Sequence, residues 1–350
     1  MANSSRHRPV TIRDIAKETC LSVTTVSVVL SGKADARGIA AETRARVLEA
    51  AGRLGYQHNG YARTLRTGRS NLIGIVGVDL DHPVPLMGVH HAARAVLQRG
   101  YSLSLHDLGW QQDEQARMLA ELESRRIEGL LVVTGRIVRR ARSVLERLSA
   151  RGIPIVALDD WGVPDFDVVT VDRAEGAYLA TRHLLALGHR RIVLTVPPNP
   201  TASVLQDRLR GYRRAHAEAG VPVDESLLLA PVEGIRDFQA GMELARRVLA
   251  HPARPTAMFC SNDRIAIGAL RALYEAGKRV PDDLALVGFD GIEEAEFTPV
   301  PLTTVQQPME EVACTAVSLL IERLNSGVAD RQPRRIVLPP RLIVRRSCGA

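Results

Sequence analysis

The groups in this sequence best suited to acid–base or metal chemistry are two pairs of adjacent carboxylates and one pair of adjacent histidines. The carboxylates are Asp159–Asp160 and Asp282–Asp283, and the histidines are His90–His91. Sequence neighbours seldom form a working acid–base pair, and adjacent positions on a helix point to different sides, which does not suit a shared metal ion. No GxGxxG, P-loop or GxSxG motif accompanies them. We therefore expect a protein that is not an enzyme and that uses no cofactor or metal.

A different chemistry, hydrogen bonding to phosphates, fits the hydroxyl-rich segment Val23–Leu30 and its flanks. If this segment is the second helix of a helix-turn-helix, its N-terminal side chains lie at base edges in the major groove. Hydroxyl groups that contact phosphates fix the register without reading the sequence. The residues expected to face bases are Val23, Thr24, Ser27 and Val28, and the expected phosphate donors are Ser22, Thr25, Ser27 and Ser31.

Three short helices would position these side chains. The first is expected at Ile12–Thr19 with Thr11 as its N-cap, and the second at Val23–Leu30 with Ser22 as its N-cap. The third is expected at about Ala41–Leu54. The residues that helical spacing places on the inward faces are Ile12, Ile15, Ala16, Val26, Val29, Leu30, Val47, Leu48, Ala51 and Leu54.

The net charge of +7 lies entirely at the N-terminal end of the chain. Residues 1–70 hold 12 Lys and Arg against 5 Asp and Glu, whereas the other 280 residues hold 34 of each. A basic module on a neutral body is typical of nucleic-acid-binding proteins. The segment 58–70 has too few apolar residues for a core, so we interpret it as a hinge with one or two helical turns that need a partner surface.

From Leu72 onward, short apolar strands alternate with amphipathic helices in two successive series. This alternation predicts an α/β architecture of parallel sheets covered by helices on both faces. Two series indicate two doubly wound subdomains with a ligand cleft at the carboxyl ends of their strands. The expected domains are an all-α helix-turn-helix head at 1–57, the hinge at 58–70 and a core domain at 71–350. Within the core domain, the first subdomain is expected at about 71–170 and 298–326, and the second at about 171–297 and 327–350.

Length and composition agree with a globular protein of two or three domains. The 350 residues are 45% hydrophobic and 24% charged. There is no run of about 18 apolar residues that would predict a membrane span. The polar N-terminus lacks the apolar stretch of a signal peptide, so we expect a cytoplasmic protein. Wide spacing favours buried free thiols over zinc or redox chemistry for the cysteines, which are Cys20, Cys260, Cys314 and Cys348.

Several longer motifs follow one another in a characteristic order. In the head and hinge they are TIRDIAKETCLSVTTVSVVLSG, IAAETRARVLEAAGRLGYQHN and ARTLRTGRSNLIGIV; in the core domain they include RLRGYRRAHAEAG, FCSNDRIAIGALRAL, VPDDLALVGFDGI and PLTTVQQP. Nearly the whole chain thereby resembles the lactose-repressor/galactose-repressor (LacI/GalR) family of bacterial regulators. The resemblance implies a sequence-specific transcriptional regulator, usually a repressor, with a core similar to periplasmic sugar-binding proteins. A small effector, a sugar or related metabolite, would control its operator affinity.

The resemblance also implies a homodimer on a roughly palindromic operator, with a hinge that folds in the minor groove. Leu65 matches the leucine that is wedged into the central base step, with Ala62 beside it and Asn59 just before. Packing of Leu65 against the core domain is the alternative. The residues assigned to double-stranded DNA are Thr11, Ile12, Ser22, Val23, Thr24, Thr25, Ser27, Val28, Ser31, Tyr56, Asn59, Ala62, Leu65 and Arg66.

Two departures from the family pattern concern the head. Cys20 stands in the helix–helix turn where the family usually has glycine, which bears on the backbone geometry of the turn. Val28 stands where the family commonly has arginine, a residue that pairs with guanine N7 and O6. Valine cannot make that pair, so we expect an operator that differs from the usual family sequence at that base pair.

The resemblance also assigns residues to the effector, and these are Asp160, Trp161, Arg208, Arg236, Asn262 and Asp290, with Asp263 next to Asn262. Asp290 suits a pair of hydroxyl donors, whereas Arg208 suits a hydroxyl or a carboxylate. Trp161 could stack on a sugar ring or a base, or could pack in the interior. The loop DLDHPVPLMGVHHA lacks the family's usual aromatic, and together with Arg236 this points to a different or more acidic effector.

Two other classes of protein stay open from the residues alone. A ligand-binding module of a transport system would need an export signal and no basic head. An enzyme on a doubly wound fold would need a nucleophile or a cofactor motif. The effector, the operator, and repression versus activation are not determined, and a dimer is favoured over a tetramer because no heptad-bearing tail follows Ala350.

Overall fold

A computed structural model divides the chain into two compact units, residues 1–70 and residues 71–350. The structure describes residues 10–31, 34, 37–56, 69–77, 82–107, 121–122, 124–133, 142–160, 166–196, 203–232, 234–326 and 332–350. Among these residues, no helix is long and apolar enough to cross a membrane.

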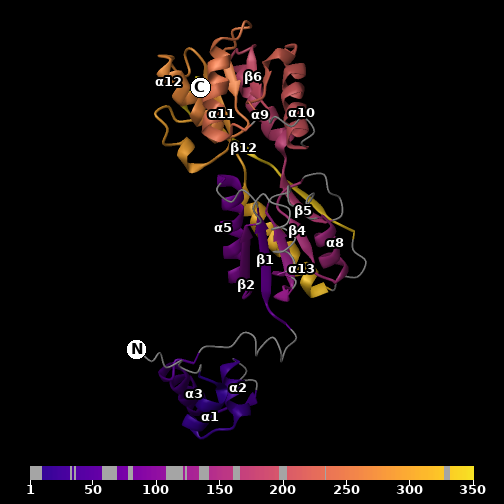
Figure 1. The fold of residues 1–350 in the computed structure, drawn as a ribbon, viewed down its shortest axis with the longest axis vertical. Coiled ribbons are helices and arrows are strands. Elements are labelled where there is room, and N and C mark those ends of the chain that lie inside the picture. Colours follow the sequence, from indigo (N-terminus) through magenta and orange to yellow (C-terminus); the bar gives the residue numbers. More distant parts are fainter. Residues whose placement is uncertain are drawn as a thin grey trace, which may run out of the picture. The chain divides into compact units, whose positions relative to one another are not determined.

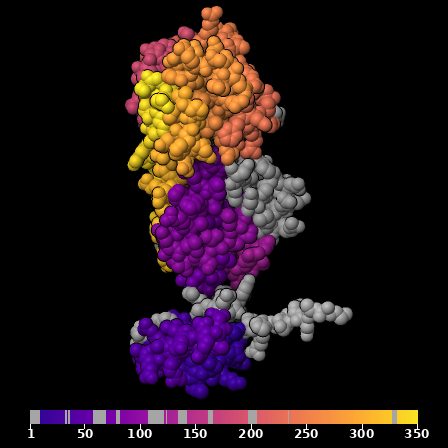
Figure 2. All heavy atoms as spheres, turned by 90° about the vertical axis from the view of Figure 1, so that its left-hand side faces the viewer, coloured from indigo at the N-terminus to yellow at the C-terminus, as the bar shows by residue number. Residues whose placement is uncertain are grey.

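Three helices pack around a small apolar core in the head (Figure 1), and the bounds predicted for the first two are confirmed. They are α1 (Ile12–Thr19), α2 (Val23–Leu30) and α3 (Ala41–Arg53). Figure 2 shows the described part of the head as a closely packed group of atoms. Its buried side chains are Ile15, Ala16, Val26, Val29, Ala34, Val47, Ala50 and Ala51.

One predicted core residue of the head is wrong. Leu48 is 50% exposed, whereas Val47 and Ala51 are buried together with Ala50. Successive helical residues are about 100° apart. Leu48 therefore lies one step off the stripe of positions that faces α1 and α2.

Local side chains fix the ends of the head helices. The Asp14 carboxylate accepts hydrogen bonds from the Thr11 backbone N–H at 2.8 Å and from its hydroxyl at 2.7 Å. Ser22 Oγ accepts from the Thr25 N–H at 3.0 Å, which satisfies a donor at the start of α2. Cys20 adopts φ 53° after α1, so the thiol-bearing residue takes the left-handed conformation that usually favours glycine. Its side chain is exposed, which corrects the expectation of a buried thiol at this position.

The core domain holds two six-stranded sheets, as two doubly wound subdomains require. The first sheet has the order β11-β5-β4-β3-β1-β2, and its pairings are parallel. Its strands are β1 (Leu72–Gly77), β2 (Ser102–Asp107), β3 (Gly129–Val132), β4 (Ile155–Ala157), β5 (Asp167–Val171) and β11 (Arg335–Leu338). The helices α5 (Pro83–Gln98), α8 (Arg142–Ala150) and α13 (Met309–Ser326) accompany it (Figure 1).

The second sheet has the order β12-β10-β9-β8-β6-β7, and β12 runs antiparallel to β10. Its strands are β6 (Ile192–Thr195), β7 (Leu228–Leu229), β8 (Ala257–Phe259), β9 (Ala285–Asp290), β10 (Thr303–Gln306) and β12 (Arg341–Ile343). Its helices are α9 (Arg173–Ala186), α10 (Ser203–Glu218), α11 (Asp237–Leu249) and α12 (Asp263–Glu275), and the 3-10 turns η2 (Glu225–Leu227), η3 (Glu293–Ala295) and η4 (Arg346–Cys348) complete the subdomain.

The chain passes between the two subdomains at three described points: after β5, after β10 and between β11 and β12. Two expected subdomain boundaries therefore change. The strand β10, in the range 298–326 expected in the first subdomain, pairs with β9 of the second, and β11, expected in the second, pairs with β5 of the first. Both are short strands whose hydrophobic pattern does not reveal which sheet they extend. Figure 2 shows orange and yellow atoms of the C-terminal third against both subdomains.

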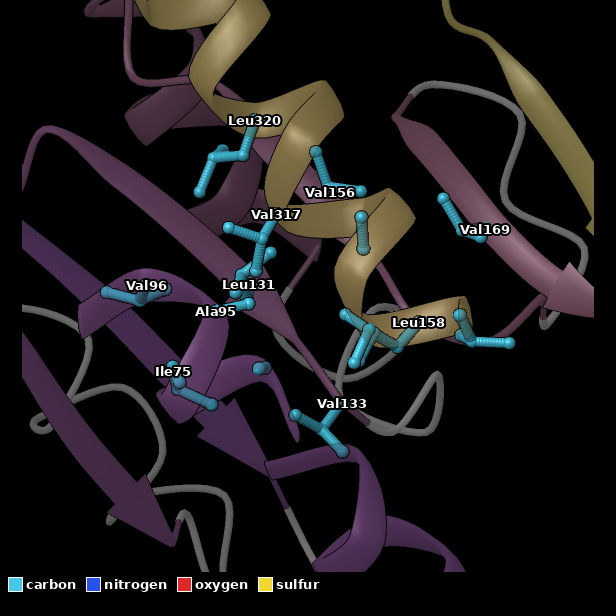
Figure 3. Packing of buried hydrophobic residues seen from close by; sticks show 14 of the residues in the cluster. Ile75, Ala95, Val96, Leu131, Val133, Val156, Leu158, Val169, Val317 and Leu320 are labelled. Carbon is cyan, nitrogen blue, oxygen red and sulfur yellow. The ribbon is translucent and has the colours of Figure 1, made fainter. Parts of the chain in front are cut away.

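Both faces of the first sheet are buried because alternate residues of each strand point to opposite sides. Ile75 and Leu131 pack on the face covered by α5 and α13, whereas Val76 and Leu130 pack on the face covered by α8. Figure 3 shows Val317 and Leu320 of α13 against Leu131 and its neighbours.

The helices of the second subdomain pair at very short range through glycines. A Cβ added to Gly211 of α10 would lie 2.0 Å from the Ala174 carbonyl oxygen of α9. At Gly268 of α12, an added Cβ would lie 1.9 Å from the Phe238 carbonyl oxygen of α11. Only glycine permits this approach, and it sets where the helices place their functional side chains.

Candidate nucleic-acid interface and effector site

The side chains predicted to read DNA lie at the start of α2 and one turn later. Val23 is 47% exposed, and Thr24 is also exposed, whereas Ser27 and Val28 are half-buried. A surface of this kind at a helix start suits contact with base edges in a groove. Methyl groups dominate it, so it is suited to contact with the C5-methyl group of thymine rather than to bidentate hydrogen bonding.

The predicted phosphate donors carry local hydrogen bonds as well. Ser22 and Thr25 share a contact of 2.8 Å between their hydroxyl oxygens, and the Ser31 hydroxyl donates to the Val28 carbonyl at 2.9 Å. Ser31 would have to release that carbonyl to donate to a phosphate. Ser22 already accepts from the backbone, so its oxygen both caps α2 and lies at its exposed start.

The remaining predicted DNA contacts divide into two groups. Thr11 is half-buried, and Ile12 and Tyr56 pack in part against the apolar core of the head. Those in the hinge lie outside the described residues, and they are Asn59, Ala62, Leu65 and Arg66.

Two cations of the head hold its helices together. Arg46 of α3 donates to the Thr19 carbonyl at 2.5 Å, and Arg53 pairs with Glu18 at 2.9 Å. Both arginines reach from α3 to α1. Part of the basic charge of the head therefore stabilises the packing of α3 against α1. The positions of Arg46 and Arg53 in the sequence did not predict this role.

The residues predicted to bind an effector lie where strands end, the position at which doubly wound folds bind ligands. Asp160 follows β4, Asn262 follows β8, and Asp290 is the last residue of β9. Arg208 lies on α10, and Arg236 precedes α11. Trp161 lies outside the described residues.

Asp290 is a buried carboxyl in an unusual backbone conformation. It is 4% exposed, has φ 130°, and accepts a hydrogen bond from Gln307 Nε2 at 2.8 Å. Burial holds its pKa well above the ordinary range, and the nearby Asp263 charge adds to this, while Arg208 acts in the opposite direction. A protonated carboxyl of this kind can donate a hydrogen bond to a ligand.

Arg208 is the cation whose charge acts on that carboxyl. Its guanidinium carbon lies 4.5 Å from the centre of the Phe289 ring, within cation–π range. Its Nε is buried without a hydrogen-bond partner, although the side chain as a whole is half-exposed. Burial lowers the Arg208 pKa, and the charges of Asp290 and Asp207 act against that shift. The structure therefore brings Arg208 and Asp290 into one electrostatic neighbourhood, as the sequence predicted.

Asn262 and Asp263 have different tasks. Asn262 is half-buried, and its Oδ1 caps α12 by accepting from the Ile265 N–H at 2.7 Å. Asp263 is fully buried, and it accepts from the Thr304 hydroxyl at 2.6 Å and from the backbone N–H groups of Gly291 and Ile292. Both Asp263 oxygens accept hydrogen bonds within the fold, which gives this residue a structural task, and its contact with an effector stays a prediction.

The Asp159–Asp160 pair links segments instead of forming an acid–base site. Asp159 pairs with the buried Arg173 at the start of α9, which lies in the other subdomain. Asp160 pairs with Arg335 of β11 at 2.7 Å. Burial lowers the pKa of Arg173 to about 10, and the Arg208 charge contributes to that shift. Local sequence gave no sign that Arg173 would be buried and paired.

The other candidate groups for chemistry are structural or at the surface. Asp282 and Asp283 both pair with Arg279, and the rings of His90 and His91 pack edge to face at 5.2 Å. Among the described residues, no group of three or more His, Cys, Asp or Glu could hold a metal ion. Arg236 is exposed before α11. The next residue, Asp237, lies 3.9 Å from His82 at the start of α5 in the first subdomain.

Comparison with known proteins decides the family. Residues 11–59 match the family described as bacterial regulatory proteins, lacI family, and residues 181–348 match the periplasmic binding protein-like domain. The HTH-type transcriptional repressor PurR of Mannheimia succiniciproducens is 34% identical over 339 residues, which cover 96% of this chain and 98% of the relative. The chain belongs to the lacI family.

Solved structures of other lacI-family proteins have the same fold. A lac repressor dimer bound to operator and the anti-inducer ONPF superposes with a TM-score of 0.82 at 27% identity, over 98% of this chain and all 100% of that chain. A complex of the transcriptional regulator CelR with cellobiose gives a TM-score of 0.69 at 28% identity, over 97% and 100%. This lacI-family chain is therefore a DNA-binding transcriptional regulator with a helix-turn-helix head and a two-subdomain core of periplasmic-binding type.

Proposed function

We propose that this lacI-family regulator acts in the cytoplasm as a homodimeric repressor of a roughly palindromic operator. A small effector bound at the carboxyl ends of the core strands controls its operator affinity. The observation that carries the proposal is the pairing, in one chain, of an exposed α2 surface on a basic head with the buried Arg208–Asp290 neighbourhood in the core domain.

The exposed side chains of α2 support sequence-specific reading. Val23 and Thr24 present methyl groups at the start of the helix, and Val28 is half-exposed one turn later. These groups favour thymine methyl contacts. Phosphate contacts from Thr25 and Ser27, together with the net charge of the first 70 residues, supply the sequence-independent part of binding.

The strand-end residues support an effector of the sugar or related class. Asp290 can share hydrogen bonds with hydroxyl groups, Arg208 offers a guanidinium beside an aromatic ring, and Asn262 lies at the start of α12. The solved CelR relative contains cellobiose, which is a sugar. We place the effector of this chain at the carboxyl ends of its core strands.

Control of DNA binding is proposed to pass through the segments that connect the subdomains. Asp159 and Asp160 of the first subdomain pair with Arg173 and Arg335, which flank two of the crossing points. A ligand that prefers one angle between the subdomains shifts the population toward it. Effector affinity and operator affinity must then change each other by the same factor.

Selection of binding sites from a random duplex pool tests the DNA-reading part. The intact chain should enrich a palindromic sequence, and its affinity should fall steeply between about 50 and 200 mM salt because phosphate contacts release counterions. Residues 71–350 alone should enrich nothing. The matched variant Val28→Arg should change the selected base pair toward guanine at one position of each half-site. Enrichment of the same sequence by the truncated chain would overturn the proposal.

A thermal-shift screen against sugars, organic acids and nucleosides tests the effector part. A ligand present at 100 times its Kd should stabilise the core domain by about 2.7 kcal/mol. The stabilising ligand should also change the operator affinity of the intact chain. A ligand that stabilises the core domain and leaves operator affinity unchanged would contradict effector control.

A further inference from the structure

We propose that the effector of this regulator is an acid: a hydroxylated carboxylate whose carboxyl group pairs with the guanidinium of Arg208. The inference rests on the proposed function, because it names the chemical class that the same site accepts. It follows from a partly buried cation that has no ion-pair partner among the residues that the structure describes.

Two arginines in the interior of the core domain differ in how their donors are used. Arg323 donates from Nε and Nη2 to the two oxygens of Asp167, each at 2.7 Å, and from Nη2 to the Gln332 carbonyl at 3.0 Å. Arg208 has a buried Nε without a partner, and it forms no hydrogen bond or ion pair within the described part of the chain. A charge removed from water without a partner is costly. The fold therefore leaves Arg208 ready for an external acceptor.

The acids near Arg208 cannot neutralise it. Asp207 already pairs with Arg210 at 2.7 Å and lies 3.7 Å from Arg173. Asp290 lies beyond ion-pair distance, and burial together with the Asp263 charge raises its pKa well above the ordinary range. Asp290 instead accepts a hydrogen bond from Gln307 Nε2 at 2.8 Å, and within the described part of the chain it forms no ion pair with the guanidinium.

The charge balance favours a carboxylate over a phosphate. A planar guanidinium forms paired parallel hydrogen bonds with a carboxylate, and one such group matches one negative charge. The second buried cation nearby, Arg173, is already paired with Asp159, so it is not available for the second charge of a phosphate. Asp290, Gln307 and Asn262 add polar groups at the adjoining strand ends. Such groups suit hydroxyls next to the acid.

The first test needs no ligand. Arg208→Met keeps an unbranched side chain that ends at about the position of Nε and removes the guanidinium with its charge, so the Tm of the ligand-free variant should equal or exceed that of the wild type. Arg323→Met, the matched change at an arginine with an acid partner, should lower the Tm by several degrees. A fall of the Arg208→Met protein as large as that of Arg323→Met would mean that Arg208 is structural and would overturn the inference.

The second test compares an acid with its neutral isostere. Glycolate and glycolamide, galacturonate and galactose, and inorganic phosphate are each titrated against the full-length chain in thermal-shift measurements. Glycolate and galacturonate should raise the Tm, whereas glycolamide and galactose should not. The acid-specific rise should disappear in Arg208→Met and persist in Arg213→Met, an exposed arginine on the same helix that pairs with Glu225.

Each outcome of this comparison decides the question. Equal shifts with acid and isostere, no shift with either acid, or an acid-specific shift that persists in Arg208→Met would overturn the inference. A larger Arg208-dependent shift with phosphate would replace carboxylate by phosphate. A neutral sugar that stabilises wild type and Arg208→Met alike and alters operator affinity would leave the proposed function standing and reject the acidic class alone.

Discussion

The two subdomains each contain an arginine beside an aspartate in their interior, and the two neighbourhoods are organised in opposite ways. In the first subdomain, Asp167 accepts from Arg323 and from the Arg334 backbone N–H, all at 2.7 Å. In the second, Arg208 and Asp290 influence each other's pKa without a hydrogen bond or ion pair between them. The first neighbourhood is complete as the chain folds, whereas the second is complete only with a further molecule.

The difference teaches how to separate structural from ligand-binding charges in this fold. The Arg323–Asp167 pair ties α13 to β5 and to the residues just before β11, which are three segments far apart in sequence. Arg208 packs over the Phe289 ring but forms no ion pair within the described part of the chain. A charged group that the fold leaves unpaired is an indicator of function because its placement costs stability.

The largest expected effect is the loss of the complete pair. Arg323→Met leaves Asp167 buried without its cation, so the free energy of unfolding should fall by about 3–5 kcal/mol. Urea unfolding followed by circular dichroism measures this change. The double variant Arg323→Met/Asp167→Leu should be more stable than Arg323→Met alone, because neither charge is then left buried. If the double variant loses as much free energy of unfolding as the two single variants together, Arg323 and Asp167 do not act as a pair, and the contrast with Arg208 fails.

The position of Arg208 near Asp290 depends on how closely α10 packs against α9, and a glycine at their contact permits that close packing. Gly211 lies less than one turn after Arg208 on α10, where an added Cβ would meet the Ala174 carbonyl oxygen at 2.0 Å. Gly211→Ala should push α10 away from α9, lower stability by about 1–3 kcal/mol or more, and weaken the effector response. The control is Gly52→Ala in α3, where an added Cβ meets nothing within 4 Å. It should stabilise the head by up to about 1 kcal/mol, and thermal unfolding of both variants checks the opposite signs.

The raised pKa of Asp290 makes the comparison depend on pH. Its folded-state pKa is raised, so its stabilising contribution is present below the ordinary carboxyl pKa and is lost as pH rises toward the folded value. Asp290→Asn cannot lose that proton, so its stability relative to wild type should increase with pH by at most about 1.4 kcal/mol per pH unit. Urea unfolding between pH 5 and pH 8, in buffers without carboxylates, measures it. A difference between the two proteins that is constant across this range would contradict a protonated Asp290.

The smallest effect is expected at an arginine that is neither structural nor part of the site. Arg213 pairs with Glu225 on the surface, with both side chains at least half exposed. Exposed pairs contribute about 0–1 kcal/mol, so Arg213→Gln should barely change the unfolding midpoint or the effector response. A large fall in the unfolding midpoint or in the effector response of Arg213→Gln would mean that the exposure of an arginine does not indicate whether it contributes to stability or to effector binding.

Local features of the fold were predictable from the sequence. The bounds of α1 and α2 and the capping role of Ser22 depend on residues within one helical turn, so the sequence pattern carries them directly. The position of Leu48 was not predictable with the same accuracy, because a shift of one residue around a helix decides between burial and exposure.

Features that depend on distant partners were harder to predict. Asn262 and Asp263 are adjacent and both polar, yet only Asp263 is fully enclosed by Thr304, Gly291 and Ile292. Arg173 was missed for the same reason, since its acid partner comes from the other subdomain. The position of a residue in the sequence does not show which distant groups it contacts in the folded chain.

By itself, the sequence determined the basic helix-turn-helix head, the strand–helix alternation of the core domain and the position of Asp290 at a strand end. These follow from periodicity, helix caps and the order of motifs, which are properties of short segments. Only the tertiary structure decided that β10 extends the second sheet and β11 the first, and which interior charges found partners. The physical reason is that strand pairing and charge compensation are contacts between residues far apart in the chain, and their geometry exists only once the chain has folded.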